Sequence, residues 1–189
     1  MKLENLIDFE WYNEPDNVLF SDHEMKIVAE PQTDFWLSLH HQMKKDNAHF
    51  FYKKCSGNFS LIVKWRFDKA ENFNQCGIMV RVDERNWFKA SILSKDESNP
   101  EIGTCLTVSG YSDWAGALLN EAPHEIFYKL EKKGEDFICS YSLDGEKYVR
   151  LRQFYLKSLD SEVKIGAYIA APQHNTFEAI LDDIEVKLK

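Results

Sequence analysis

The sequence predicts an all-β fold in which two antiparallel sheets pack as a sandwich or close into a barrel. About a dozen short segments alternate apolar and polar residues, as strands with one buried face do, and turn-forming residues separate them. Almost no segment repeats its apolar residues with the period of a helix. No internal repeat, low-complexity linker or domain boundary interrupts the 189 residues, so we expect a single domain over 1–189.

Short strands are expected along the first part of the chain. Leu6–Asn13 and Asn17–Phe20 have the length and composition of edge segments. Glu24–Glu30 alternates, with Met25, Ile27 and Ala29 on one side. Pro31 ends it, because proline has no N–H to donate to a β-ladder. Asp34–Leu39 is the next expected strand.

The middle of the chain contains the clearest single strand. His40–His49 is polar and is expected to be a loop, after which Phe50–Lys54 resumes strand character. In Phe59–Asp68 the large apolar residues occupy every second position, which predicts one buried face. These residues are Phe59, Leu61, Val63, Trp65 and Phe67.

The stretch Phe73–Leu93 predicts a hairpin that turns at Asp83–Asn86. Side chains of a strand point alternately to opposite faces, so one face of this hairpin is apolar and the other is polar and aromatic. The apolar set is Cys76, Ile78, Val80, Val82, Phe88, Ala90 and Ile92. The polar and aromatic set is Gln75, Met79, Arg81, Trp87 and Lys89. A shift of one residue turns every side chain of a strand to the opposite face. The apolar residues of the two strands therefore lie on the same face only if the loop has an odd number of residues.

The last third of the chain predicts further strands with one irregular stretch. Ile102–Gly110 is expected to be a strand, and Tyr111–Pro123 is less regular, with room for a helical turn around Ala115–Asn120. His124–Glu131, Asp136–Ser142 and Lys147–Phe154 predict two successive hairpins.

Three features of the final strands complete the pattern. The second hairpin turns at Asp144-Gly145, a dipeptide suited to positive φ. Val163–Ala171 is expected to be a strand that Pro172 ends. In Thr176–Leu188 the apolar positions change face, which predicts a β-bulge near Asp182-Asp183.

Composition limits the classes of partner and compartment. At 44% hydrophobic residues the chain can build a sizeable core, and 14% aromatic residues suit a β-rich or ligand-binding protein. A net charge of −8 argues against nucleic acid and against an anionic membrane surface. The amino-terminal residues lack the apolar run of a signal peptide, so we expect a cytoplasmic protein. The four cysteines have no metal-ligand spacing and are expected to be buried, reduced thiols.

The order of motifs along the chain resembles the DUF1349 family. The motifs are DFW (34–36), DNAHF (46–50), GNFSLIV (57–63), QCGIMVRVDERNWFK (75–89), SDW (112–114), YSLDG (141–145), IGAYIAAP (165–172) and LDDIEV (181–186). The departures are mild: Asn74 stands where many members carry Asp, Cys76 replaces a small residue, and Ala48 precedes His49 where Gly is usual.

The resemblance implies a jelly roll of two curved sheets, like the concanavalin A-like lectins and glucanases. The family's biochemical function is largely undefined, and one member is named for the regulation of enolase. In related jelly rolls the concave sheet commonly carries a carbohydrate site, which is an argument from the fold alone.

A sugar-like ligand on the concave sheet is the first functional hypothesis. Sugars need an aromatic surface for their C–H faces and polar side chains for their hydroxyls. The candidate ligand-binding residues are Trp36, His49, Tyr52, Gln75, Arg81, Trp87, Lys89, Asp113 and Trp114. A structural interpretation of the same residues remains open. Each Trp could pack in the core, and Arg81 and Lys89 could be solvated charges on a sheet face.

The second hypothesis is a protein-interaction or regulatory module that acts on a metabolic enzyme. It predicts an exposed apolar patch outside the groove, or a groove plugged by the protein's own side chains. A glycoside hydrolase is a weaker alternative, because the E-x-D-x-x-E motif of glucanases with this fold is absent. The nearest group of carboxylates is Glu178, Asp182, Asp183 and Glu185, in a terminal strand expected to be structural. No nucleophile, cofactor or metal motif is present, so we expect no catalytic residue and no cofactor.

Overall fold

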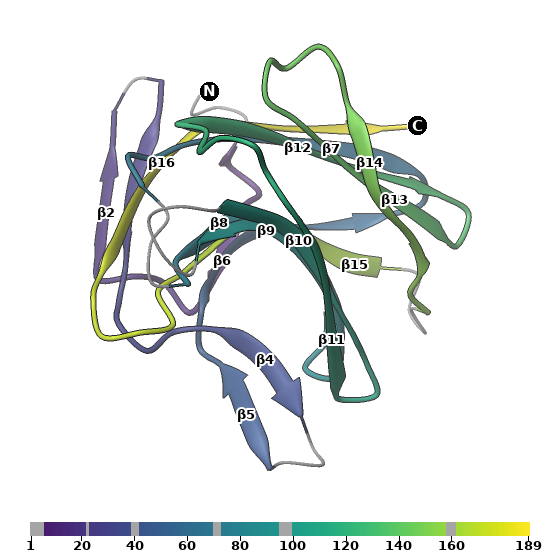
Figure 1. Cartoon of the computed structure of the whole chain (residues 1–189). Helices are drawn as coiled ribbons and strands as arrows, with labels where there is room; N and C mark the ends of the chain where they lie inside the picture. Colours follow the sequence, from purple (N-terminus) through teal and green to yellow (C-terminus); the bar gives the residue numbers. More distant parts are fainter. Residues whose placement is uncertain (1–5, 22, 39–41, 70–72, 95–99, 158–161) are drawn as a thin grey trace.

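The structure, a computed structural model, describes residues 6–21, 23–38, 42–69, 73–94, 100–157 and 162–189. In these residues the chain forms two antiparallel sheets that pack as a curled sandwich, which confirms the predicted fold class (Figure 1). In the view of Figure 1, one sheet lies across the top and the other curls away below it.

Sheet A is the larger sheet. Its strands are, in spatial order, β1 (Glu10–Tyr12), β6 (His49–Ser56), β15 (Glu162–Ala170), β8 (Gln75–Asp83), β9 (Asn86–Ser94), β10 (Pro100–Val108), β11 (Tyr111–Leu118), β4 (Phe35–Ser38) and β5 (Met43–Asp46). Sheet B contains β14 (Val149–Tyr155), β13 (Asp136–Ser142), β12 (Glu125–Lys133), β7 (Phe59–Arg66), β16 (Phe177–Leu188), β3 (Met25–Ala29) and β2 (Asn17–Phe20).

The main core fills the space between the two sheets. Every second side chain of a strand points into this core. In β3, Met25, Ile27 and Ala29 are buried, while the residues between them are half-buried. β7 and the central hairpin β8–β9 follow the same rule. Cys55, Cys76, Cys105 and Cys139 are free and buried, as the sequence predicted.

The predicted bulge and turns are confirmed. The pairing of β16 with β7 shifts between Leu181 and Asp183, which reconciles the two apolar faces of the last strand. Hairpins join β12 to β13 and β13 to β14. Gly145 has φ 76, the positive value that the turn needs.

The expected helical turn around Ala115–Asn120 is wrong. A tight turn at Ser109 and Gly110, both with positive φ, starts a hairpin in which β11 pairs with β10 from Tyr111 to Leu118. Residues 115–118 are exposed on both faces of the strand. Their sequence therefore does not alternate between apolar and polar residues, and a strand cannot be recognised from it.

The expected loop at His40–His49 is also wrong in its second half, while His40 and His41 lie outside the described residues. Met43–Asp46 forms β5, and His49 begins β6 with a side chain that is buried rather than solvated. β5 is an edge strand of sheet A, where charged side chains are usual, which accounts for its polar sequence.

The turn between β13 and β14 predicts a pH-dependent contribution to stability. The Asp144 carboxylate accepts hydrogen bonds from the backbone N–H groups of Lys147 and Glu146, both at 2.8 Å, and from Ser142 Oγ at 2.9 Å. These bonds lower the pKa of Asp144 to about 2. Because the pKa is depressed in the folded state, the contribution is present above the ordinary carboxyl pKa and is lost as the pH falls to about 2.

We therefore expect Asp144→Ala to lower the melting temperature near neutral pH and to have little effect at about pH 2. Thermal unfolding of the variant and the wild type at the two pH values measures this difference. An equal loss at both pH values would mean that the ionised carboxylate is not what stabilises the turn.

Candidate functional site

The central hairpin has the facing that the sequence predicts. Cys76, Ile78 and Val80 of β8 enter the main core, and Arg81 pairs with Trp87 on the opposite face. A bulge between Arg81 and Asp83 leaves an odd number of residues between this pair, so both strands keep their apolar residues on one side. The opposite face, however, is not open: Arg81 is 3% exposed, Lys89 1% and Trp87 0%.

A second group of buried side chains covers this face of sheet A, and we call it the concave cluster. Its members are Phe35, Leu37, Ala48, Phe50, Tyr52, Met79, Trp87, Cys105, Tyr168 and Ala170. Phe35 and Leu37 belong to the β4–β5 hairpin, and the ring centroid of Phe35 lies 6.2 Å from that of Trp87. The hairpin therefore lays its apolar side over the face on which a ligand was expected.

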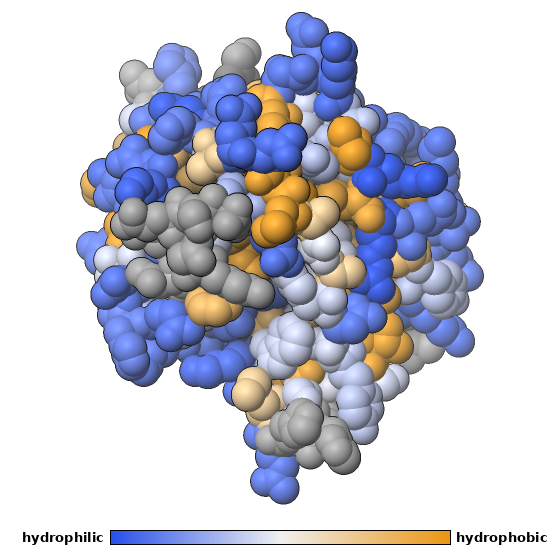
Figure 2. All heavy atoms as spheres, viewed as in Figure 1, coloured by the Kyte–Doolittle hydropathy of each residue, from blue (hydrophilic) through white to orange (hydrophobic). Residues whose placement is uncertain are grey.

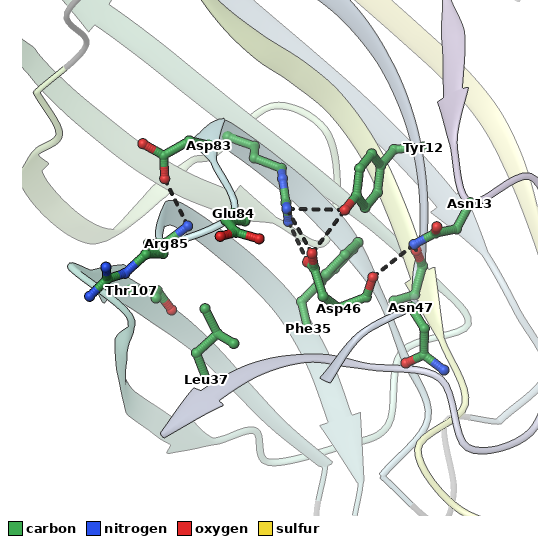
Figure 3. Close-up of polar contacts among 12 residues, drawn as sticks. Tyr12, Asn13, Phe35, Leu37, Asp46, Asn47, Asp83, Glu84, Arg85 and Thr107 are labelled. Atoms are coloured by element: carbon green, nitrogen blue, oxygen red, sulfur yellow. Dashed lines mark hydrogen bonds and ion pairs between the residues drawn. The ribbon is translucent and has the colours of Figure 1, made fainter. Parts of the chain in front are cut away.

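Side chains of β1 and β5 join the two edges of sheet A. The Tyr12 hydroxyl on β1 donates to Asp46 Oδ2 on β5 at 2.8 Å, and Asn13 Nδ2 donates to the Asp46 carbonyl (Figure 3). Asn13 Nδ2 also donates to the Ala48 carbonyl at 3.0 Å. Since β1 and β5 are the two edge strands, the sheet curls almost closed around the concave cluster.

Arg81 forms a buried bidentate ion pair inside this curl. Its Nη1 and Nη2 donate to Asp46 Oδ1 at 2.7 Å and Oδ2 at 3.0 Å, and the guanidinium carbon lies 4.5 Å from the Tyr12 ring centroid. Burial and the hydrogen bond to Asp46 raise the pKa of Tyr12. A bidentate pair between an arginine and a carboxylate fixes the relative orientation of the two side chains, so Arg81 holds β5 against β8.

Lys89 forms a second buried ion pair beside the first. Its Nζ donates to Asp34 Oδ1 at 2.7 Å and to Gln75 Oε1 at 3.0 Å, and the Tyr168 hydroxyl donates to the same Gln75 oxygen at 3.1 Å. Asp34 directly precedes β4. Thus both cations of the predicted ligand face are paired with carboxylates from the two ends of the covering hairpin.

His49 and Tyr52 also hold segments of the fold. His49 Nε2 lies 2.8 Å from Glu30 Oε2, and its Nδ1 lies 2.7 Å from the carbonyl of Asn13. The Tyr52 hydroxyl donates to Glu10 Oε2 at 2.8 Å, and burial together with this bond raises the pKa of Tyr52 to about 12.

Two of the three predicted tryptophans keep exposed surface. Trp36 is half-buried and packs against the concave cluster from β4. Trp114 on β11 is half-buried too; its ring lies over Gly103, and its Nε1 donates to the Glu101 carboxylate. Asp113 does not join this set, because it lies on the other face of β11 and pairs with Arg152 of β14 at 3.0 Å.

The carboxylates near the C-terminus are engaged in ion pairs on sheet B. Asp182 pairs with Lys64 at 2.8 Å, Glu178 with Lys26 at 2.8 Å, and Glu185 with Lys187 at 2.9 Å. Among the described residues no three His, Cys, Asp or Glu side chains gather as metal ligands. The same residues contain no helix that is long and apolar enough to cross a membrane.

Sequence reasoning missed the partners that close the concave face: Tyr12, Asp34 and Asp46. Asp34 and Asp46 do lie within the DFW and DNAHF motifs. Their cations lie 55 and 35 residues away along the chain, however, so no local spacing connects them.

Comparisons with known proteins agree with this fold. A family model described as "Protein of unknown function (DUF1349)" matches residues 11–189. The chain is 30% identical over 108 residues to "Regulation of enolase protein 1" of Saccharomyces cerevisiae, a match that covers 57% of this chain and 54% of that protein. The match thus spans about half of the curated relative's length.

Solved structures with the same fold come from several sources. A functionally unknown protein from Saccharomyces cerevisiae has a TM-score of 0.89 at 21% identity, with 98% of each chain covered. The GH43 BlXynB protein from Bacillus licheniformis has a TM-score of 0.72 at 14% identity, over 95% of this chain and 36% of that one. At these identities the likeness concerns the fold alone.

Proposed function

Because the chain belongs to DUF1349, a family of proteins of unknown function, we propose its function from its surface: it is a protein-binding module that regulates a metabolic enzyme. The concave cluster supports this proposal, because the protein's own side chains occupy the face on which a sugar groove was expected. A regulatory module with a plugged groove must bind through another surface.

An exposed apolar row on sheet A carries the proposal. Val108 pairs with Tyr111, Tyr111 with Ser38, and Ser38 with Met43, so these four side chains lie side by side on one face of β10, β11, β4 and β5. Val108 is 47% exposed, Tyr111 57% and Met43 51%. Four adjacent strands extend about 14 Å, which suits the centre of a protein interface. We call this set the edge row.

Hydrophilic side chains cover most of the face seen in Figure 2, so exposed apolar side chains are a minority there. Tyr and Met are enriched at the centres of protein interfaces, whereas Lys and Glu are depleted there. The name of the yeast relative, "Regulation of enolase protein 1", supports a metabolic enzyme as the partner.

Calorimetric titration of the full chain with enolase from the organism that encodes it tests the proposal. We expect saturable binding that Tyr111→Glu or Met43→Glu weakens by roughly 30-fold, as expected for a hot-spot residue. Leu19→Glu is the matched control, because Leu19 is 68% exposed on β2 of sheet B and outside the edge row. Absence of binding, or equal affinity of all variants, would refute the proposal.

A second candidate function is sugar binding at the β10–β11 end of the concave face. Trp114 supports it: the ring lies over Gly103 and is only half-buried, and Gly116 and Leu118 beyond it on the same face are exposed. An aromatic ring with a free face offers the surface on which the C–H groups of a sugar stack.

Tryptophan fluorescence during titration with neutral mono- and disaccharides tests this candidate. A saturable change that disappears in Trp114→Ala is the expected result. Trp36→Ala provides the comparison, because Trp36 is also half-buried but lies on β4. A change that survives in Trp114→Ala would rule out this site.

A further inference from the structure

We propose a second small-molecule site, for a neutral polyhydroxylated ligand, in a cleft at the end of sheet B. The cleft has a volume of about 610 Å³, within the range of small-ligand sites. It is formed where β7 ends and β16 begins, beside the residue that precedes β8. Residues that line it include Arg66, Phe67, Asp68, Asn74, His124 and Phe177. None of them belongs to the concave cluster or the edge row.

An unpaired amide oxygen on a residue that lines this cleft carries the proposal. Asn74 is 6% exposed, and its Oδ1 is buried without a hydrogen-bond partner in the described part of the chain. A buried acceptor without a partner is costly, and such groups are rare in native proteins. The missing partner of Asn74 Oδ1 must be a hydrogen-bond donor, and a hydroxyl group of a ligand is such a donor.

The charges around the cleft favour a neutral ligand. Arg66 already pairs with Glu24 and, at 3.2 Å, with Asp182. Glu178 pairs with Lys26, and His124 Nδ1 lies 3.1 Å from the carbonyl of Asp68. A charged ligand would have to compete with these pairs, whereas hydroxyl groups donate to Asn74 Oδ1 and to the Asp68 carboxylate without displacing them.

Two further features accompany the cleft. Phe67 and Phe177, which line it, are 7% and 3% exposed with ring centroids 6.4 Å apart, so part of the lining is apolar and suits the C–H groups of a polyol. Phe73, next to Asn74, has φ 65, which is unusual for a bulky residue and is a kind of strain found at functional sites. Its ring borders a smaller hollow of about 380 Å³ that shares Asn175 with the cleft.

NMR titration of the ¹⁵N-labelled full chain tests the site, with D-glucose and myo-inositol as probes. We expect saturable shifts of the Asn74 side-chain amide and of the backbone amides of Asn175 and Thr176. Inorganic phosphate is expected to leave these signals in place. Shifts with phosphate alone, or saturable shifts only at residues outside the cleft, would overturn the proposal.

The variant Asn74→Leu separates a ligand site from a structural role. Leucine has a similar size and removes the unpaired acceptor, so we expect an unchanged or higher melting temperature and a loss of sugar affinity of about tenfold or more. Asn17→Leu is the matched control on the exposed edge strand β2 and should change neither. A lower melting temperature with unchanged sugar affinity would assign Asn74 to the fold. Tyr111→Glu should leave the titration intact, which separates this site from the enzyme-binding proposal.

Discussion

Asp46→Ala is expected to lower the free energy of unfolding by about 3–5 kcal/mol, because it leaves the Arg81 guanidinium buried without its counter-charge. Arg81 is 3% exposed, and Asp46 supplies both oxygens of its bidentate pair. The Tyr12 hydroxyl loses its acceptor as well. For a chain of this length the loss corresponds to a melting temperature roughly 10 °C lower. Thermal or denaturant unfolding measures the effect.

Asp113→Ala is the matched control for this experiment. Asp113 also pairs with an arginine, but its side chain is 66% exposed, so the pair with Arg152 contributes about 1 kcal/mol or less. The double variant Asp46→Leu with Arg81→Met removes both charges and is expected to recover much of the lost stability. If Asp46→Ala costs no more than Asp113→Ala, the ion pair does not hold the β4–β5 hairpin.

Trp87→Ala is expected to cost about 3–5 kcal/mol, the range for removing a large aromatic side chain from a packed core. Trp87 is 0% exposed and contacts Phe35 of the covering hairpin. Its Nε1 has no partner among the described residues, so Trp87→Phe removes an unsatisfied donor and is expected to cost much less than Trp87→Ala.

Trp114→Ala provides the comparison for Trp87→Ala, since Trp114 lies on the same face but is half-buried. We expect its effect on the free energy of unfolding to be clearly smaller. Equal effects of the two substitutions, both below about 1 kcal/mol, would mean that Trp87 is a surface residue and that the concave face is open.

The sequence patterns predicted how side chains face far better than how deeply they are buried. Alternation placed Arg81, Trp87 and Lys89 on one side of the hairpin because a strand has a fixed period of two. The face change in β16 likewise predicted a bulge between Leu181 and Asp183. Both are local properties of one or two strands, which a sequence displays directly.

What the sequence did not reveal depends on residues far apart in the chain. Lys89 on a sheet face reads as a solvated charge or a ligand-binding group until Asp34 is known to cover it. β11 was missed because residues 115–118 are exposed on both sides and have no alternation. The unpaired Asn74 is visible only once the residues around it are placed.

Hydrogen exchange at the Trp87 indole N–H tests most directly whether the concave face of sheet A is sealed. The chain has 5 tryptophans, and each gives one indole signal in a ¹⁵N-labelled sample. We predict that the Trp87 signal exchanges only through opening of the β4–β5 hairpin, far more slowly than that of Trp114, and does not shift when sugars are added. Exchange as fast as that of Trp114, or a saturable shift with a sugar, would contradict a sealed face and restore Trp87 as a ligand-binding residue.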